Sequence, residues 1–106
     1  MVARGDVWLV ELDPTVGSEI QKTRPCVILS PLELHDYLRT VTVAPMTTGS
    51  RPAPFRVAVT FQRKAGLILL DQIRTVDKSR LVRRAGGLSE RIVQDTLRTL
   101  REAFAD

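Results

Sequence analysis

The sequence contains few of the residue types on which common enzyme chemistry depends. Among its 106 residues there is one histidine, His35, and one cysteine, Cys26. A single cysteine excludes an intrachain disulfide, and the shortage of both residue types excludes a structural zinc site of the usual Cys/His kind. No serine–histidine–aspartate set is visible, so we interpret His35 as a surface histidine in a polar connection. Cys26 lies in an apolar run, which predicts a small buried side chain.

Long apolar runs, glycine-rich phosphate loops and internal repeats are also missing. No run approaches the ~18 apolar residues of a membrane helix. The N-terminal stretch MVARGDVWLVELD lacks the uninterrupted apolar centre of a signal peptide, so we expect a cytoplasmic protein. Asp and Glu are scattered without the spacing of a divalent-metal site, and we expect neither a metal nor another cofactor. The length suits one domain, residues 1–106.

Positive charge is concentrated in the middle of the chain. The formal net charge is +4, and residues 39–84 contain ten basic residues but only two acidic ones, Asp71 and Asp77. Arginine supplies all but three of the sixteen basic residues, and its guanidinium group matches phosphate oxygens in a bidentate way. This basic block indicates a polyanionic partner such as nucleic acid. A solvated basic face without a partner is the alternative.

The pattern of apolar residues predicts short strands followed by one helix. We expect strands at residues 6–12, 25–30, 40–47, 55–61, 67–70, 71–76 and 81–86. The strand PCVILS is nearly continuous in apolar residues, which predicts burial on both faces. A short helical turn is expected within residues 31–38, and a turn at 77–80. From Ser89, a good N-cap, the apolar residues follow one helical stripe to Phe104. Together these elements predict a mainly β fold with a C-terminal helix, in a small and strongly curved barrel.

Arg24 stands where a polar loop, GSEIQKT, meets an apolar strand. Pro25 fixes its own φ and pushes Arg24 toward extended geometry, so the guanidinium group is held beside a movable loop. Cleavage of RNA by the substrate's own 2′-hydroxyl suits this small set of residues. It requires a phosphate held in line, neutralised charge on the phosphoryl oxygens and two proton transfers. An arginine, a hydroxyl residue and a carboxylate suffice for these tasks.

Four motifs resemble those of the MazF/PemK toxin family and occur in the same order. They are RGDVWLVELDPTVGSE, TRPCVILS, TVTVAPMTT and LILLDQIRTVDKSRL, which with the C-terminal helix cover nearly the whole chain. The resemblance implies a small SH3-like barrel of the CcdB/PemK type that forms a homodimer. It implies the toxin of a type II toxin–antitoxin pair, a sequence-specific and metal-independent endoribonuclease. Such an enzyme cuts single-stranded RNA, chiefly mRNA, leaves 2′,3′-cyclic phosphate and 5′-hydroxyl ends, and inhibits translation and growth. A cognate MazE-like antitoxin, acidic and partly disordered, is the implied protein partner.

The resemblance also implies three catalytic residues. The arginine of the family's RP motif matches Arg24, the threonine after the third strand matches Thr47, and the glutamate of GSE matches Glu19. Because a guanidinium group stays protonated at pH 7, we interpret Arg24 as a phosphate clamp and proton donor. Thr47 would hydrogen-bond the phosphate, and Glu19 is the candidate base for the 2′-hydroxyl. The structural alternatives are an Arg24–Glu19 ion pair, capping of a strand end by Thr47 and Thr48, and a solvated Glu19.

Six further residues are candidates for RNA binding: Ser18, Thr48, Arg51, Arg56, Gln72 and Arg74. Gln72 would read a base edge, Arg74 would bind a phosphate, and Arg51 and Arg56 would guide the backbone. Trp8 and Phe55 are candidates for base stacking, although aromatic residues of strands more often belong to a core. We expect the loops at 13–23 and 48–54 to determine base preference.

Two other functions remain open. CcdB, a gyrase poison that acts by binding a protein, resembles this family in architecture. It lacks the RP…TT arrangement, so Arg24 and Thr47 favour the ribonuclease. A plain nucleic-acid-binding barrel would bind phosphate with a steep salt dependence and cut nothing.

Overall fold

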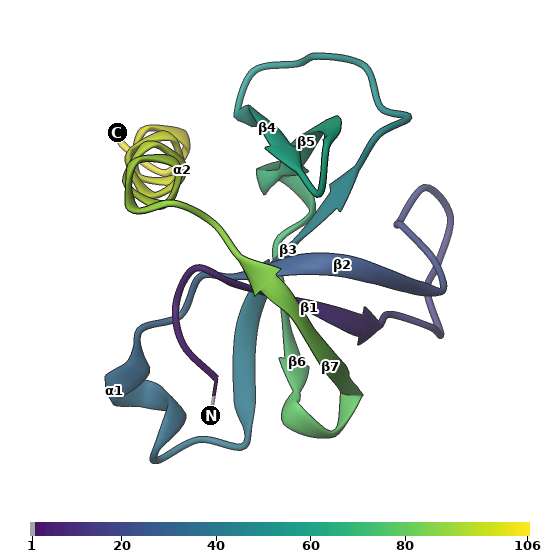
Figure 1. Ribbon diagram of the computed structural model, residues 1–106, viewed down its shortest axis with the longest axis vertical. Coiled ribbons are helices and arrows are strands. Elements are labelled where there is room, and N and C mark those ends of the chain that lie inside the picture. Colours follow the sequence, from purple (N-terminus) through teal and green to yellow (C-terminus); the bar gives the residue numbers. More distant parts are fainter. Residues whose placement is uncertain (1) are drawn as a thin grey trace.

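The computed structural model describes residues 2–106, and it consists of one bent sheet with a helix at its C-terminal end (Figure 1). Seven strands pair in the order β4-β5-β3-β2-β1-β7, with β6 paired to β3. The strands are β1 (Asp6–Glu11), β2 (Thr23–Ile28), β3 (Thr40–Thr47), β4 (Arg56–Phe61), β5 (Lys64–Leu69), β6 (Arg74–Asp77) and β7 (Leu81–Gly87). The helices are α1 (Leu32–His35) and α2 (Glu90–Ala103), with 3₁₀ turns at Leu70–Gln72 and Lys78–Arg80.

β3 forms the centre of the sheet because its pairing partner changes along its length. Its first half pairs with β6, residues 43–45 pair with β2, and Met46 and Thr47 pair with β5. All of these pairings are antiparallel. The sheet therefore bends around β3 (Figure 1). This arrangement confirms the predicted mainly β fold with a C-terminal helix.

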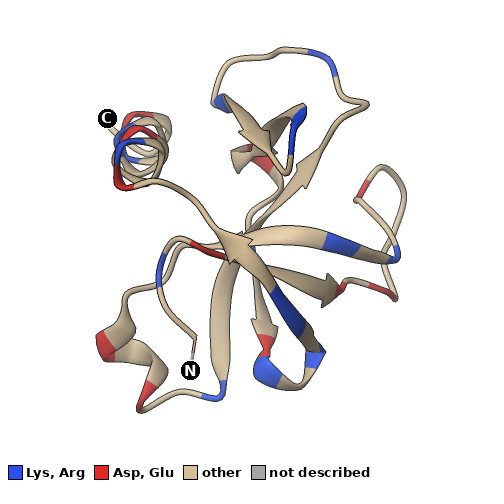
Figure 2. Cartoon of the chain, viewed as in Figure 1, with Lys and Arg blue, Asp and Glu red and all other residues tan. Residues whose placement is uncertain are grey.

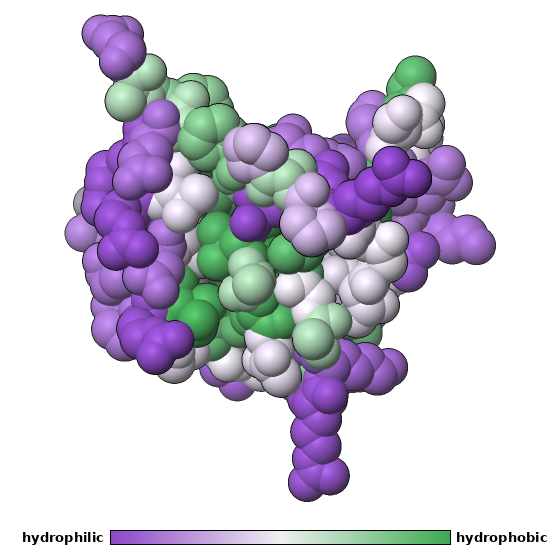
Figure 3. All heavy atoms as spheres, turned by 90° about the horizontal axis from the view of Figure 1, so that it is seen from above, coloured by the Kyte–Doolittle hydropathy of each residue, from purple (hydrophilic) through white to green (hydrophobic). Residues whose placement is uncertain are grey.

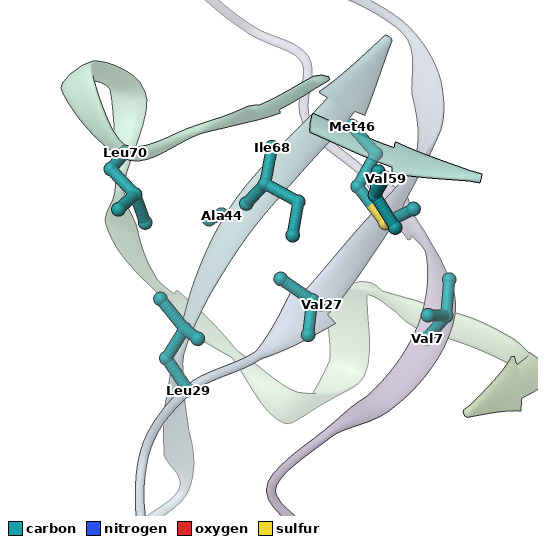
Figure 4. Packing of buried hydrophobic residues seen from close by; sticks show 8 residues of the cluster. All are labelled: Val7, Val27, Leu29, Ala44, Met46, Val59, Ile68 and Leu70. Carbon is teal, nitrogen blue, oxygen red and sulfur yellow. The ribbon is translucent and has the colours of Figure 1, made fainter. Parts of the chain in front are cut away.

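β2 contributes to two cores because successive side chains of a strand point to opposite faces. Val27 belongs to the first core and is 1% exposed, whereas Cys26 and Ile28 belong to the second core and are fully buried. The first core contains Val7, Val27, Leu29, Ala44, Met46, Val59, Ile68 and Leu70 (Figure 4). The second contains Val10, Leu12, Cys26, Ile28, Val41, Val43 and Val76. The predictions that this strand is buried on both faces and that Cys26 is buried are confirmed.

α2 covers part of the first core. The Ser89 hydroxyl accepts a hydrogen bond from the Ile92 N–H at 3.3 Å, so Ser89 is the predicted N-cap. Val93 is buried, and Ile92, Leu97 and Leu100 pack against the first core while remaining partly exposed. Figure 3 shows apolar side chains in a hollow on this side of the molecule, bordered by hydrophilic ones. Neither α1 nor α2 is long and apolar enough to cross a membrane.

Three of the predicted strands have boundaries that are wrong by two residues or more. β2 begins at Thr23, two residues earlier than expected, and ends at Ile28. The predicted strand at 71–76 begins only at Arg74, because Leu70–Gln72 forms a 3₁₀ turn. β5 begins at Lys64, because Gln62 and Arg63 alone form the turn between β4 and β5. Both turn residues have positive φ, 51° and 68°. A two-residue hairpin of this kind usually carries glycine or asparagine, which is why its position was missed.

His35 is not a surface residue, so that prediction is wrong. Its side chain is only 5% exposed, and both ring nitrogens have partners. The Val2 carbonyl can only accept, so Nδ1 donates to it at 3.0 Å, and Nε2 accepts from the Ser30 hydroxyl at 2.7 Å. The Ser30 hydroxyl in turn accepts the Thr42 N–H at 3.0 Å. His35 therefore links the N-terminal segment to β3 through buried hydrogen bonds.

Replacement of His35 by alanine is expected to destabilise the fold. His35→Ala removes two hydrogen bonds and leaves the buried Ser30 hydroxyl without its acceptor, so the free energy of unfolding should fall by about 1–3 kcal/mol. Urea denaturation followed by Trp8 fluorescence measures this change. Tyr37→Ala is the matched control, because Tyr37 lies two residues away and is 85% exposed. The control should change stability by less than about 0.5 kcal/mol. Equal urea midpoints for His35→Ala and the wild type would contradict this account.

Candidate functional site

Arg24 lies near the start of β2, opposite Val10 of β1. Its side chain is exposed, and its Nε donates to the carbonyl of Gln21 at 3.2 Å. Pro25 follows where β2 pairs with β1 alone, since pairing with β3 begins at Cys26. Proline is tolerated at such a position because no ladder hydrogen bond is lost there. The strand therefore holds the base of Arg24, while its guanidinium group faces solvent and has no ion pair within residues 2–106.

Thr47 is the last residue of β3, and β5 approaches its backbone closely. The Thr47 hydroxyl accepts the Gly49 N–H at 3.3 Å, so Thr47 does cap the strand end. A hydroxyl that accepts one hydrogen bond can still donate its own proton to a ligand. A Cβ at Gly66 would lie 2.6 Å from the Thr47 carbonyl oxygen, so only glycine fits there. Capping and ligand binding by Thr47 are therefore compatible. Gly66 leaves the space that the Thr47 backbone occupies at this strand end.

One pocket brings Arg24, Thr47 and Thr48 together. It has a volume of about 300 Å³. Its lining residues are Leu9, Arg24, Pro25, Met46, Thr47, Thr48, Val59, Phe61, Gln62, Lys64, Gly66, Leu67, Arg83 and Ala85. We call this the first pocket. Three of its lining residues are basic, namely Arg24, Lys64 and Arg83, and none is acidic, so it suits an anionic ligand.

Glu19 lines a second pocket of about 350 Å³, together with Gln72 and Arg74. The other residues of this second pocket are Leu12, Ile20, Pro45, Asp71 and Ile73. The Glu19 carboxylate is exposed and accepts the Val16 N–H at 3.2 Å, within its own loop. Pro45 of this lining lies only two residues before Thr47 of β3. The structure thus separates Glu19 from the pocket of Arg24 and Thr47, although both pockets adjoin β3.

Gln72 and Arg74 both hold the segment between β1 and β2. The Gln72 side-chain oxygen accepts the Ile20 N–H at 2.9 Å, and Arg74 donates to the Leu12 carbonyl at 3.2 Å. Each side chain is half-buried. Their predicted role in RNA binding therefore coexists with a structural one, because each already binds a backbone group of this segment.

Arg56 is held by an ion pair. Its Nε and Nη2 donate to the two carboxylate oxygens of Asp71 at 3.0 and 2.9 Å, and its Nη1 donates to the Arg51 carbonyl at 2.9 Å. The hydrogen bond from Arg56 lowers the pKa of the Asp71 carboxyl. Arg51 and Ser18 are exposed, and neither lines the first or the second pocket. Arg56 thus fixes the loop at 48–54, whose Arg51 side chain faces solvent.

Neither aromatic candidate for base stacking, Trp8 or Phe55, lines one of the two pockets. Trp8 packs against the second core, and its Nε1 donates to Asp6 at 3.3 Å. Phe55 is 44% exposed and lies outside both pockets.

Burial raises the pKa of the Cys26 thiol to about 12, so this cysteine is not a nucleophile at neutral pH. Within residues 2–106, no group of three or more His, Cys, Asp and Glu side chains has a metal-binding arrangement.

Three polar residues of the first pocket were missed by the sequence analysis: Gln62, Lys64 and Arg83. Gln62 donates from its side chain to the Ala85 carbonyl at 3.1 Å, and both residues line the pocket. Lys64 and Arg83 belong to the basic block at residues 39–84. Without the strand register, the sequence does not show that these two residues lie at the same pocket as Arg24. The two-residue turn before Lys64 and the bulges in the pairing of β1 with β7 set that register.

Comparison with known sequences identifies close relatives. Residues 3–104 match the family described as PemK-like, MazF-like toxin of type II toxin–antitoxin system. The chain is 39% identical over 100 residues to the endoribonuclease PemK of Escherichia coli, which covers 89% of this chain and 75% of that protein. It is 41% identical over 96 residues to the endoribonuclease MazF of Staphylococcus epidermidis, with coverages of 85% and 80%.

Comparison with solved structures shows the same fold. MazF from Deinococcus radiodurans superposes with a TM-score of 0.84 at 21% identity, covering 96% of this chain and 94% of that one. An endoribonuclease from a mycobacterial species, solved in complex with its cognate antitoxin, gives a TM-score of 0.81 at 22% identity. That match covers 97% of this chain and 94% of the other. These two structures therefore have the same fold as this chain.

A side chain at position 66 is expected to displace the threonines of the first pocket. Gly66→Ala places its Cβ against the Thr47 backbone, and the overpacking should cost about 1–3 kcal/mol of stability. The amide ¹H–¹⁵N chemical shifts of Thr47 and Thr48 report the displacement, and thermal unfolding reports the stability. For the change in stability, Gly49→Ala is the control from the adjacent turn, because its Cβ would meet nothing within 4 Å. Unchanged Thr47 and Thr48 shifts in Gly66→Ala would show that the close approach does not constrain them.

Proposed function

Because the chain belongs to the family of PemK-like, MazF-like toxins of type II toxin–antitoxin systems, we propose that it is an endoribonuclease that cuts single-stranded RNA. The two relatives named above are endoribonucleases at about 40% identity over most of the chain. The observation that carries the proposal is the first pocket, which both Arg24 and Thr47 line and which has no acidic lining residue. We propose that mRNA is the main substrate and that cleavage at short sequences inhibits translation and growth.

The proposed reaction uses the 2′-hydroxyl of the substrate as nucleophile. The 2′ oxygen bonds to the phosphorus atom, the bond to the 5′ oxygen breaks, and the products are a 2′,3′-cyclic phosphate and a 5′-hydroxyl. The 2′-hydroxyl loses a proton, and the leaving 5′ oxygen gains one. Arg24 would neutralise the phosphoryl oxygens and protonate the leaving group, and the Thr47 hydroxyl would donate to the same phosphate. None of these steps requires a metal ion.

Glu19 is the proposed base for the 2′-hydroxyl, and this role requires movement. Its carboxylate lines the second pocket, whereas Arg24 and Thr47 line the first. The segment between β1 and β2 would have to carry Glu19 toward the first pocket when RNA binds. The exposure of Glu19 and its contact with Val16 inside the same loop are compatible with such a movement.

The remaining candidates would bind the RNA outside the reacting phosphate. Thr48 lines the first pocket beside Thr47, and Gln72 and Arg74 line the second. We propose that Gln72 reads a base edge through its amide and that Arg74 binds a phosphate. Ser18, Arg51 and Arg56 would guide the backbone through the loops at 13–23 and 48–54, with Arg56 acting while paired to Asp71.

Two protein partners are proposed. A cognate MazE-like antitoxin would compete with RNA for the basic surface, and the solved complex of the mycobacterial relative with its antitoxin supports this partner. A second copy of the chain would form a homodimer, which the partly exposed apolar side chains beside α2 favour (Figure 3). We place the protein in the cytoplasm, where its RNA substrate would be.

The two alternatives are not favoured by the comparisons. A CcdB-like gyrase poison would need no arginine and threonine together in one pocket, and the relatives named above are ribonucleases. A plain nucleic-acid-binding barrel would use the same cations without cutting. Both alternatives predict no new RNA ends, which makes cleavage the discriminating measurement.

Incubation of the purified protein with a long, defined single-stranded RNA in excess EDTA tests the proposal. Every new 5′ end is mapped, and direct labelling by polynucleotide kinase distinguishes 5′-hydroxyl from 5′-phosphate ends. We expect discrete cuts with 5′-hydroxyl ends, which also give the recognition sequence. A folded sample, free of antitoxin, that leaves several different RNAs intact would support the gyrase poison or the binding barrel instead.

Substitutions in the first pocket should separate the two catalytic roles. Arg24→Ala should lower the cleavage rate by about a hundredfold or more, because it removes the main charge at the phosphate. Thr47→Ala should cost about tenfold if it removes one neutral hydrogen bond. Single-turnover cleavage rates measure both, with unchanged melting temperatures as the check on folding. Arg91→Ala, an exposed arginine on α2 that lines neither pocket, is the control. Cleavage by Arg24→Ala at the wild-type rate would remove Arg24 from the mechanism.

A further inference from the structure

Lys64 and Arg83 are cations of the first pocket that the proposed reaction does not use. Both side chains are exposed, and neither takes part in an ion pair within residues 2–106. In contrast, Arg56 and Arg84 donate to carboxylates, and Arg74 donates to a backbone carbonyl. Two unpaired cations at one pocket without a carboxylate indicate a ligand that carries several negative charges.

The strand order places these two cations on opposite sides of the reacting centre. β5, β3, β2, β1 and β7 are successive neighbours in the sheet. Lys64 begins β5, Thr47 ends β3, Arg24 lies in β2 and Arg83 lies in β7. Figure 2 shows the basic segments on β2 and β7 and at the turn between β4 and β5. Along this strand order, Thr47 and Arg24 therefore lie between Lys64 at one end and Arg83 at the other.

The spacing of the strands separates Arg83 from Arg24. Leu9 of β1 lies opposite Pro25 of β2 on one side and opposite Arg83 of β7 on the other. Because neighbouring strands lie about 4.8 Å apart, the backbones of β2 and β7 are roughly 10 Å apart. Arginine side chains that start from backbones this far apart can bind different phosphates of one RNA strand at the same time.

Apolar residues lie among the cations of the first pocket. Leu9, Pro25, Met46, Phe61 and Leu67 contribute to the lining of the first pocket. Apolar and aromatic surface suits the faces of bases, whereas the cations suit the phosphates of the same strand. The pocket therefore offers a single-stranded nucleic acid both kinds of contact that it needs.

We propose that Arg83 and Lys64 bind the phosphates on either side of the scissile phosphate, so that the RNA strand crosses β5, β3, β2, β1 and β7. This inference rests on the proposed ribonuclease function. Arg24 and Thr47 hold the reacting phosphate, whereas Arg83 and Lys64 touch no reacting atom. They are substrate-binding residues that set the position of the strand across the sheet.

Methylphosphonate substitution tests this path, because it removes the charge of one chosen phosphate. The substrates are short RNAs that contain the cleavage sequence mapped above, each with a single methylphosphonate on one side of the scissile linkage or on the other. The enzymes are the wild type, Arg83→Gln, Lys64→Gln and the control Arg91→Gln, which removes the same charge from the exposed face of α2. KM and kcat are measured for each pair of enzyme and substrate.

In the wild type, either methylphosphonate should raise KM by about three- to tenfold, the effect of one partly exposed charged contact. Arg83→Gln should lose its sensitivity to one of the two substitutions, and Lys64→Gln should lose its sensitivity to the other. In both variants kcat should stay within about twofold, and the slope of log(kcat/KM) against log salt should weaken by about 0.7. Arg91→Gln should behave as the wild type.

Three results would overturn the inference. If both variants keep the wild-type sensitivity to both linkages, neither side chain binds a flanking phosphate. If both lose sensitivity to the same linkage, the strand does not cross the sheet between them. If no methylphosphonate affects the wild type, the flanking phosphates are not bound. Each sensitivity is a ratio measured on one protein, so a partly folded variant does not obscure it. An absence of cleavage by the wild type would instead refute the proposed function itself.

Discussion

The close approach of β5 to the end of β3 is the constraint on which the candidate site depends. Gly66 leaves room for the Thr47 carbonyl, so Met46 and Thr47 can pair with β5 after β3 has left β2. This change of partner bends the sheet and opens the first pocket between the two pairings. Thr47 reaches that pocket from the bend, and Arg24 and Lys64 reach it from the strands on either side. The position of the pocket residues thus depends on a backbone contact, between Gly66 and Thr47, in which no side chain takes part.

The sequence predicted the strands well where side-chain periodicity was strong, and poorly where backbone conformation decided the structure. The alternation at 40–47 and the apolar run after Pro25 were sufficient to locate β3 and the buried part of β2. The turn at Gln62 and Arg63 was missed because neither residue is typical of positive φ. His35 was misplaced because its burial depends on hydrogen bonds to Val2 and Ser30, which no local pattern reveals.

Only part of the candidate site could be predicted from the sequence, because local patterns do not show contacts between residues far apart in the chain. A sequence locates arginines but does not show which of them already bind protein oxygens. In the basic block, Arg56, Arg74 and Arg84 are engaged by neighbouring groups, whereas Lys64 and Arg83 remain unpaired at the first pocket. Arg24 and Thr47 do share a pocket, as the resemblance to a known family suggested. Their separation from Glu19 depends on how the segment between β1 and β2 folds, which the motifs do not encode.

The hydrogen bond between Gln72 and Ile20 couples the binding of a ligand at Gln72 to the position of the segment between β1 and β2. The Gln72 oxygen accepts the Ile20 N–H, so a ligand that displaces this N–H from the oxygen competes with the backbone of the segment between β1 and β2. Its affinity for the protein then includes the free energy of releasing that segment. A substitution that lowers the free energy of releasing the segment strengthens the binding of such a ligand by up to the same amount. A side chain remote from Gln72 can in this way alter which ligand the amide selects.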